Sequence, residues 1–415
     1  MAKKQKKVTP KRAPTKHQLS KWQRQTKIRR IVIIAAAVFL AGILSWVGYE
    51  SYEDYKARVG PLREVVIEVN GVPFTMEYYV KILDAYTAGM NYTDIYYSGA
   101  YIADIVTNDI IDAELLRQGT KNLGIEVTPE EIEAGLQKYG LPDNQAYRDI
   151  MTRVLSQEKL EEEYFGSQLP DTMEQAHVQV MLAESEEVAD EVVAKIEDGS
   201  NFTALAEEFS CNSSIEGDLG WLPEELMPNT LIANAAFNLT VGEISPPIYD
   251  ETATKKVGYW LIEVTERQDE EVEARAMLLG SKAEAEWVKA ELVGGNFSAL
   301  AEEYSQHESK DKGGELGLLK QGDMGSEVFD EVAFNITANE VSEPVKDESV
   351  QTTGGYWLVN VVDRGEHQLE EDVEEGLEGK HFNDWFEELK EDSTIENRLD
   401  AAKISWAVNK VLQGR

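Results

Sequence analysis

Cysteine and histidine side chains often serve in nucleophilic, acid–base or metal chemistry, and the chain has one cysteine and five histidines. They are Cys211, His17, His177, His307, His367 and His381. No HExxH, GxxxxGK[ST] or GxSxG segment occurs, and a single cysteine excludes both an internal disulfide and a site of four thiolates. The sequence therefore gives no support to a metalloprotease, a P-loop nucleotidase or a serine hydrolase, and we expect neither a metal nor another cofactor.

Cys211 and His307 each come shortly after a ten-residue segment that occurs twice in the chain. The segment NFTALAEEFS at 201–210 recurs as NFSALAEEYS at 296–305, a spacing of 95 residues. Three later segments recur at a spacing of 97 residues, GDLG as GELG, AFNLTVGEIS as AFNITANEVS, and GYWLIEV as GYWLVNV. A repeat of this length is the size of a small domain, so the sequence predicts two tandem domains at 173–268 and 269–366.

Each copy has the element pattern of an α+β unit. A strand comes first, followed by an amphipathic helix that ends near NF[TS]ALAEE, a glycine-bearing loop, a short helix and a GYWL strand. We expect each copy to fold as one unit that is closed by its own GYWL strand.

At these segments the sequence resembles the parvulin family of peptidyl-prolyl isomerases. The family pattern runs from F-x-x-L-A through G-G-D-L-G to a G-E-[IM]-S-x-P turn. It matches 202–206, 217–220 and 242–247 in the first copy, and 297–301, 313–317 and 339–344 in the second. The resemblance implies rotation about X-Pro amide bonds, which face a barrier of about 18–20 kcal/mol and rotate uncatalysed in roughly tens to hundreds of seconds.

The resemblance also implies a dry pocket that favours the twisted amide. Its apolar walls fall on Met227, Ile232 and Phe237 in the first copy, and on Met324, Phe329 and Phe334 in the second. Five residues are the catalytic candidates, Cys211, Asn212, Trp260, His307 and Trp357.

The polar centre departs from the family pattern. Parvulins place one histidine on the first strand and one on the last, with Cys or Asp in the loop between them. These positions fall on Val180, Trp260 and Asn212 in the first copy, and on Ala276, Trp357 and His307 in the second. The loop of the first copy is two residues shorter, so Cys211 is an alternative to Asn212, and the nearby His177 is an alternative for the missing first-strand histidine. Tryptophan can still close an apolar pocket and donate an indole N–H.

The region 64–172 is expected to be a mainly helical lobe. A short strand at 65–70, an Asn70-Gly71 turn and Thr75 as a helix cap begin it, and Thr128-Pro129-Glu130-Glu131 opens a later helix after Gly124. The VNG entry and the LGIEVTPEEI run at 123–132 resemble the chaperone lobe of SurA-, PrsA- and PpiD-like folding factors. In such proteins the C-terminal helix packs back on the lobe, which here implies that role for 367–415, an acidic linker followed by a helical segment.

The N-terminal region predicts a membrane anchor. Residues 31–49 are uncharged and long enough to span a bilayer, and no small-x-small cleavage site follows them. Residues 1–30 hold 12 Lys or Arg and no acidic residue, which places this tail in the cytoplasm. We therefore expect a single-pass cell-membrane protein with a linker at 50–63 and the rest of the chain outside the cytoplasm.

The net charge limits which partners the outer part of the chain can bind. The whole chain has a formal charge of -37 although its first 30 residues are basic, so binding to nucleic acid is not expected. The partners expected are unfolded or newly exported proteins with X-Pro bonds, with self-association or contact with the export machinery as further possibilities. Three functions stay open, a foldase that isomerises prolyl bonds, a non-catalytic holdase with degenerate parvulin units, and a scaffold that binds one fixed partner.

Overall fold

The computed structural model describes residues 43, 46, 59–211, 217–268 and 270–414. The chain divides into two compact units. The first unit holds the described residues up to Leu160 and those from Trp385 onward, and the second unit holds the described residues of Glu161–Asp384. The described part of the chain is mixed α and β, as expected from the sequence.

The first unit is a helical lobe with a small sheet. Its elements are η1 (Pro61–Arg63), β1 (Val65–Val69), β2 (Val72–Thr75), α2 (Met76–Tyr86), α3 (Tyr92–Leu123), α4 (Pro129–Lys138), α5 (Gln145–Lys159), β11 (Ile395–Asn397) and α13 (Ala401–Leu412). Thr75 caps α2, Gly124 ends α3 in the left-handed conformation, and Thr128 and Glu131 form a capping box at α4. The local signals read from the sequence therefore define the boundaries of these helices.

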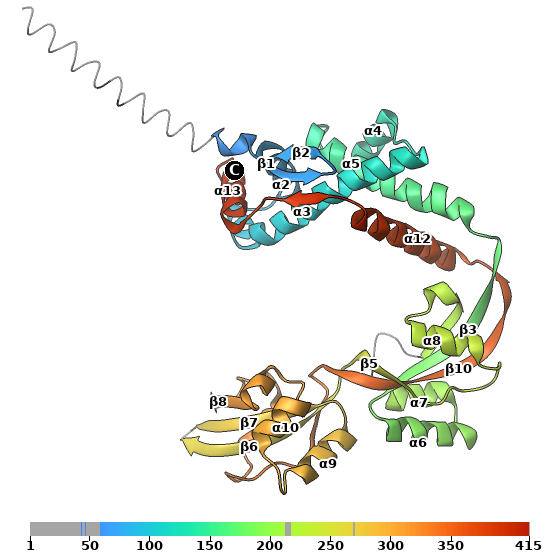
Figure 1. The fold of residues 1–415 in the computed structure, drawn as a ribbon, viewed down its shortest axis with the longest axis vertical. Helices are drawn as coiled ribbons and strands as arrows, with labels where there is room; N and C mark the ends of the chain where they lie inside the picture. The colour runs from blue at the N-terminus through green and yellow to red at the C-terminus, as the bar shows by residue number, and fades with distance from the viewer. Residues whose placement is uncertain (1–42, 44–45, 47–58, 212–216, 269, 415) are drawn as a thin grey trace, which may run out of the picture. The chain divides into compact units, whose positions relative to one another are not determined.

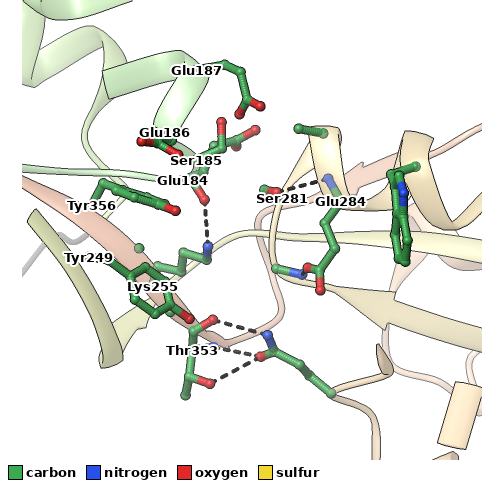
Figure 2. Close-up of a pocket in the computed structure, with 16 residues that line it drawn as sticks. Glu184, Ser185, Glu186, Glu187, Tyr249, Lys255, Ser281, Glu284, Thr353 and Tyr356 are labelled. Atoms are coloured by element: carbon green, nitrogen blue, oxygen red, sulfur yellow. Dashed lines mark hydrogen bonds between the residues drawn. The ribbon is translucent and has the colours of Figure 1, made fainter. Parts of the chain in front are cut away.

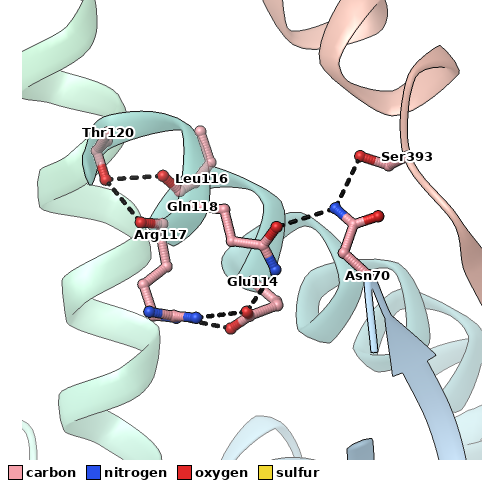
Figure 3. A network of polar contacts seen from close by, with 7 residues as sticks. All are labelled: Asn70, Glu114, Leu116, Arg117, Gln118, Thr120 and Ser393. Carbon is pink, nitrogen blue, oxygen red and sulfur yellow. Dashed lines mark hydrogen bonds and ion pairs between the residues drawn. The ribbon is translucent and has the colours of Figure 1, made fainter. Parts of the chain in front are cut away.

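The Asn70-Gly71 turn is hydrogen-bonded to two segments that are distant in the sequence. Both residues have positive φ, as a tight β1–β2 hairpin requires. Asn70 donates from Nδ2 to Gln118 Oε1 at 2.9 Å and to Ser393 Oγ at 3.1 Å (Figure 3). Its Oδ1 accepts from the Thr394 amide at 2.8 Å. One turn residue thus links the hairpin, α3 and the C-terminal segment.

The C-terminal segment completes the lobe, and the expected return of the C-terminal helix is confirmed. β11 pairs antiparallel with β1, and α13 packs on α2 and α3. The expected acidic linker is wrong, however, because residues 371–391 form the helix α12 (Glu371–Glu391). Val373 and Leu377, one turn apart, are buried, so the acidic residues between them form the solvated face of a helix.

The second unit contains two four-stranded antiparallel sheets. Its elements are η2 (Leu160–Phe165), η3 (Gly166–Gln168), β3 (Thr172–Ala183), α6 (Glu186–Glu197), α7 (Phe202–Phe209), β4 (Gly217–Pro223), η4 (Glu224–Leu226), α8 (Thr230–Asn238), β5 (Ile248–Lys255), β6 (Gly258–Gln268), β7 (Glu271–Leu279), α9 (Lys282–Glu291), α10 (Phe297–Tyr304), η5 (Glu308–Lys312), β8 (Glu315–Leu319), α11 (Glu327–Ala333), β9 (Val345–Asp347) and β10 (Thr352–Gln368). The strand orders are β4-β3-β10-β5 and β8-β7-β6-β9.

These sheets show that the repeats exchange their closing strands. β10, from the second repeat, pairs with β3 along the whole of that strand, and β6, from the first repeat, pairs with β7 (Figure 1). We call the β3-β4-β5-β10 sheet with α6, α7 and α8 domain 1, and the β6–β9 sheet with α9, α10 and α11 domain 2. The expectation that each repeat is closed by its own GYWL strand is therefore wrong, and the two domains do not coincide with 173–268 and 269–366.

Hydrogen bonds hold the two connections that cross between the domains. Lys255, which is 2% exposed, donates from Nζ to the Glu184 carbonyl at 3.0 Å, and Tyr259 donates to the Glu184 carboxylate at 3.0 Å. Gln306 and Thr353 form two hydrogen bonds (Figure 2). Gln306 Oε1 accepts from the Thr353 amide at 2.7 Å, and Gln306 Nε2 donates to the Thr353 carbonyl at 3.1 Å. These contacts surround a cavity of about 430 Å³.

Among the described residues, no helix combines the length and the apolar character needed to cross a bilayer. The expected membrane segment 31–49, apart from Ile43 and Trp46, lies outside the described residues together with the basic tail 1–30 and most of the linker 50–63.

A glycine-to-alanine pair tests the packing of the lobe. A Cβ at Gly119 would lie 2.6 Å from the Trp385 ring, whereas a Cβ at Gly379, also inside a helix, would meet nothing within 4 Å. We expect Gly119→Ala to lower the free energy of unfolding by about 1–3 kcal/mol through overpacking, and Gly379→Ala to raise it by up to about 1 kcal/mol through helix propensity. Urea unfolding of both variants measures the difference, and equal effects would contradict the packing described.

Candidate functional site

The site in domain 2 is built around Trp260 on β6. Its ring makes edge contacts with His307 (centroids 5.3 Å apart) and with Phe329 on α11 (5.2 Å apart). Met324, Phe334 and Leu316 are partly buried against the same core. The closing strand of the first repeat therefore meets the loop and helix residues of the second.

His307 is held as a neutral ring. It caps η5, and its Nδ1 accepts from the Ser309 amide at 3.2 Å and lies 2.8 Å from the Ser309 hydroxyl. Burial lowers the pKa of His307 below its ordinary value. Because Nδ1 is an acceptor, the neutral ring carries its proton on Nε2, which is then its donor atom.

Asp347 accepts a hydrogen bond from the Trp260 indole and so fixes the orientation of its ring. Its carboxylate, on a residue 1% exposed, accepts from Trp260 Nε1 at 3.0 Å, from Ser326 Oγ at 2.5 Å and from the Ser349 amide at 2.8 Å. Burial opposes its ionisation, but the hydrogen bonds from Ser326, Ser349 and Trp260 lower its pKa. Ser326 also caps α11, so one carboxylate connects the closing strand with the helix that carries Phe329.

Domain 1 repeats this arrangement with Trp357 and Asp250. Trp357 Nε1 donates to Asp250 Oδ2 at 3.0 Å, the same distance as in domain 2. Asp250 is only half-buried and also accepts from Thr252 and Ala253. The Trp–Asp pair is therefore a feature of both domains, and only in domain 2 does it reach the cap of the short helix.

Cys211 in domain 1 is a partly buried, hydrogen-bonded thiol. It packs against the core that holds Trp357, and its Sγ donates to the Leu182 carbonyl at 2.9 Å. Burial raises the pKa of Cys211 to about 11. The alternative candidate at this loop, Asn212, lies outside the described residues.

The structure gathers the other expected site residues into two groups. Met227, Ile232 and Phe237 meet Cys211 and Trp357 in domain 1, and Met324, Phe329 and Phe334 meet Trp260 and His307 in domain 2. The two tryptophans have therefore changed places relative to the sequence interpretation, because the closing strands are exchanged. Ile232 and Phe329 are fully buried and support the core, whereas the partly exposed Met324, Phe334 and Phe237 are available to a ligand.

His177 does not replace the first-strand histidine. Val180 belongs to the core of domain 1, and His177 is an odd number of residues away, so it lies on the opposite face of β3. There its Nε2 meets Asp218 Oδ1 at 2.6 Å and its ring lies 5.6 Å from that of Trp221. The first-strand positions of both domains, Val180 and Ala276, are fully buried.

The two aspartates are the site residues that the sequence reading missed. A signal was present, since Asp250 and Asp347 are themselves 97 residues apart and each comes three residues after a proline of the repeated turn.

Among the described residues, no group of three or more His, Cys, Asp or Glu side chains could hold a metal ion.

Replacing each aspartate by asparagine tests the Trp–Asp pairs. We expect Asp347→Asn to lower the free energy of unfolding by about 1–3 kcal/mol, because a fully buried acceptor loses its charge, and Asp250→Asn to cost less. Since the pKa of folded Asp347 is lowered, its contribution is present above pH about 4 and is lost as the pH falls through the folded pKa. Unfolding curves between pH 7 and pH 3 should show the free energies of unfolding of Asp347→Asn and of the unmodified protein converging in acid. A difference that stays constant over this range would contradict an ionised Asp347.

The thiol of Cys211 should react slowly with alkylating reagents. A pKa of about 11 gives roughly 10²-fold less thiolate at neutral pH than an ordinary cysteine has. Mass spectrometry of iodoacetamide labelling, with the urea-unfolded chain as the control, measures this protection. Equal rates for the folded and unfolded chains would show that Cys211 is a reactive site residue after all.

Comparison with known proteins finds two kinds of related domain in this chain. A family model described as the PPIC-type PPIASE domain matches residues 173–266 and 261–363, and a SurA-like N-terminal domain matches residues 19–179. The chain is 25% identical over 307 residues to "Chaperone SurA" of Chromohalobacter salexigens, covering 66% of this chain and 64% of that one. It is 34% identical over 155 residues to "Foldase protein PrsA" of Oceanobacillus iheyensis, covering 37% and 47%.

The chain thus spans less than two thirds of the length of either of these relatives. A solved structure, PrsA from Bacillus subtilis, aligns at 15% identity over 85% of this chain and 93% of that chain, with a TM-score of 0.20. With its SurA-like N-terminal domain and its two PPIC-type domains, the chain belongs to the family of SurA- and PrsA-type chaperones and foldases.

Proposed function

We propose that the protein is a folding factor for exported proteins in which domain 2 binds and isomerises X-Pro bonds. The contact of neutral His307 with Trp260, beside the partly exposed Met324 and Phe334, carries this proposal. Domain 1 lacks a comparable described polar group, because the Cys211 thiol is already engaged with the Leu182 carbonyl. Its partly exposed Phe237 favours binding of proline segments without catalysis.

The chemistry needs no covalent intermediate. Rotation about the X-Pro bond costs about 18–20 kcal/mol because amide resonance is lost at the twisted geometry. An apolar wall of Met324 and Phe334 would hold the proline ring away from water, and the Nε2–H donor of His307 would offer a hydrogen bond that is strongest for one carbonyl orientation. Asp347 keeps the Trp260 ring behind these groups fixed during the rotation.

The lobe would hold extended client segments. It contains a pocket of about 390 Å³ lined in part by Phe74, Tyr78, Ile110 and Ala113, with the Glu114–Arg117 ion pair at its edge (Figure 3). The lining also includes the charged side chains of Asp149 and Arg153, so the pocket offers apolar surface for a side chain of an unfolded protein and polar groups for the backbone beside it. The acidic composition of the chain favours neutral or basic clients over acidic ones.

We further propose that a single helix at 31–49 tethers the protein to the cell membrane, with the N-terminus in the cytoplasm. The uncharged run between Arg30 and Glu50 and the basic tail before it support this topology. Protease protection of an N-terminal tag in spheroplasts or protoplasts tests it. Digestion of the tag, or recovery of the chain from the soluble fraction, would contradict the tether.

A non-catalytic holdase is the second candidate. The fully buried Val180 and Ala276 favour it, because both first strands lack the histidine of the parvulin pattern. It is distinguished from the foldase by suppression of client aggregation without any effect on prolyl isomerisation.

An isomerisation assay with matched variants tests the catalytic half. Exchange NMR of a proline peptide, with residues 50–415 added, should show acceleration that His307→Ala and Phe334→Ala each reduce by about tenfold or more. Phe237→Ala, the equivalent change in domain 1, should leave the rate within about twofold. Loss of activity only in Phe237→Ala would move the active site to domain 1, and no acceleration by the unmodified chain would favour the holdase.

The rate should also report the protonation of His307. Because burial lowers its pKa, the ring stays neutral above pH about 6.5, and we expect a flat rate there with a fall only at lower pH. His307→Ala should remove that fall from whatever rate remains. A rate that drops between pH 8 and pH 7 would contradict the neutral ring described.

A further inference from the structure

The two closing strands are nearly interchangeable. GYWLIEV at the start of β6 and GYWLVNV at 355–361 of β10 differ at only two of seven positions. Ile262 corresponds to Val359, and Glu263 to Asn360. Each strand has the residues needed to pair with the first strand of either repeat, and the family matches at 173–266 and 261–363 follow the unexchanged order. Within this shared segment, these two differences are the ones that can favour one pairing over the other.

The first difference concerns charge. In the exchanged pairing Glu263 faces Arg275, with 2.6 Å between Oε2 and Nε, while Asn360 faces Gln179 and donates to it at 3.0 Å. The Glu263 side chain is 14% exposed, and the Arg275 guanidinium also lies 4.5 Å from the centre of the Phe297 ring. In the unexchanged pairing Glu263 would face Gln179 and Arg275 would face Asn360. That arrangement separates a partly buried ion pair and leaves each charge opposite a neutral amide.

The second difference concerns volume. Ile262 faces Ala276, and Val359 faces Val180, with all four residues fully buried. In the unexchanged pairing Ile262 would face Val180, and Val359 would face Ala276. One core would then hold an extra methylene and the other would lack one, and close-packed cores resist both changes.

We infer that the cross-strand pairs at these two positions specify the exchanged pairing, so that each domain and its site are built from both repeats. Both differences within the seven-residue segments complement the exchanged partner, and neither complements the unexchanged one. The exchange gives domain 2 its Trp260 and domain 1 its Trp357. Domain 2 is consequently one continuous segment of chain that is inserted between β5 and β10 of domain 1.

Disulfide trapping in the full chain tests the inference. With Cys211→Ser as the background, which keeps a hydroxyl donor for the Leu182 carbonyl, one variant carries His177→Cys and Asp363→Cys, which are opposite each other in the structure. The matched variant carries His177→Cys and Glu266→Cys, the equivalent position on β6, which is opposite Glu273 instead. After mild oxidation, peptide mapping should find at least tenfold more intramolecular crosslink in the first variant.

Exchanging the two positions should reverse this result. The chain with Ile262→Val, Glu263→Asn, Val359→Ile and Asn360→Glu carries the same residues overall, and we expect its crosslink to form mainly between positions 177 and 266. If the altered chain does not fold, the comparison in the unaltered strands still decides which pairing exists. A predominant 177–266 crosslink there, or crosslinked dimers in place of monomers, would overturn the inference, as would a folded exchange variant that keeps the 177–363 crosslink.

This test is independent of the proposed function. Its readout is the connection between two strands, so a chain without isomerase activity can still confirm the exchange, and an active chain can still refute it.

Discussion

The antiparallel pairing of β3 with β10 is the constraint on which the second unit depends. It joins residues 172–183 to residues 352–368, so domain 1 is complete only when the chain has passed through the whole of domain 2. The same crossing leaves β6 free to pair with β7 and brings Trp260 to His307. The core contacts, the polar network of Asp347 and the division into domains all follow from which GYWL strand pairs with which first strand.

This topology changes how the two sites relate to one another. Each domain uses a tryptophan where the parvulin pattern has a histidine, and each tryptophan donates its indole N–H to an aspartate at 3.0 Å. The indole and the carboxylate form a consistent pair, because an indole has a single donor and no acceptor. The domains then differ in the loop before the short helix, where domain 2 presents the ring of His307 and domain 1 presents the protonated thiol of Cys211. The proposed division into one catalytic and one binding domain rests on that difference.

Local signals in the sequence predicted much of the fold. The Asn70-Gly71 turn, the Thr75 cap, the Gly124 helix end and the capping box at Thr128 are all decided by nearby residues, so they can be read without tertiary information. The strand exchange could not be read in this way, because GYWLIEV and GYWLVNV carry the same alternation and the choice depends on the facing residues Gln179 and Arg275. The residues expected for each pocket do lie together, but each tryptophan lies with the residues of the other copy for this reason. The sequence does not predict the helix near the start of 367–415, because the many acidic residues conceal the helical spacing of Val373 and Leu377.

A titration of the labelled protein with a short proline peptide tests the central claim, that the composite site of domain 2 recognises X-Pro segments. In ¹⁵N-resolved NMR spectra, the account predicts that the indole resonance of Trp260 and the amide of Ser309 shift together, because one lies against His307 and the other donates to it. The indole of Trp357 in domain 1 would shift separately, with its own dependence on peptide concentration. If the peptide moved resonances of the lobe alone and left Trp260 and Ser309 unchanged, the composite site would not be the place where proline is recognised.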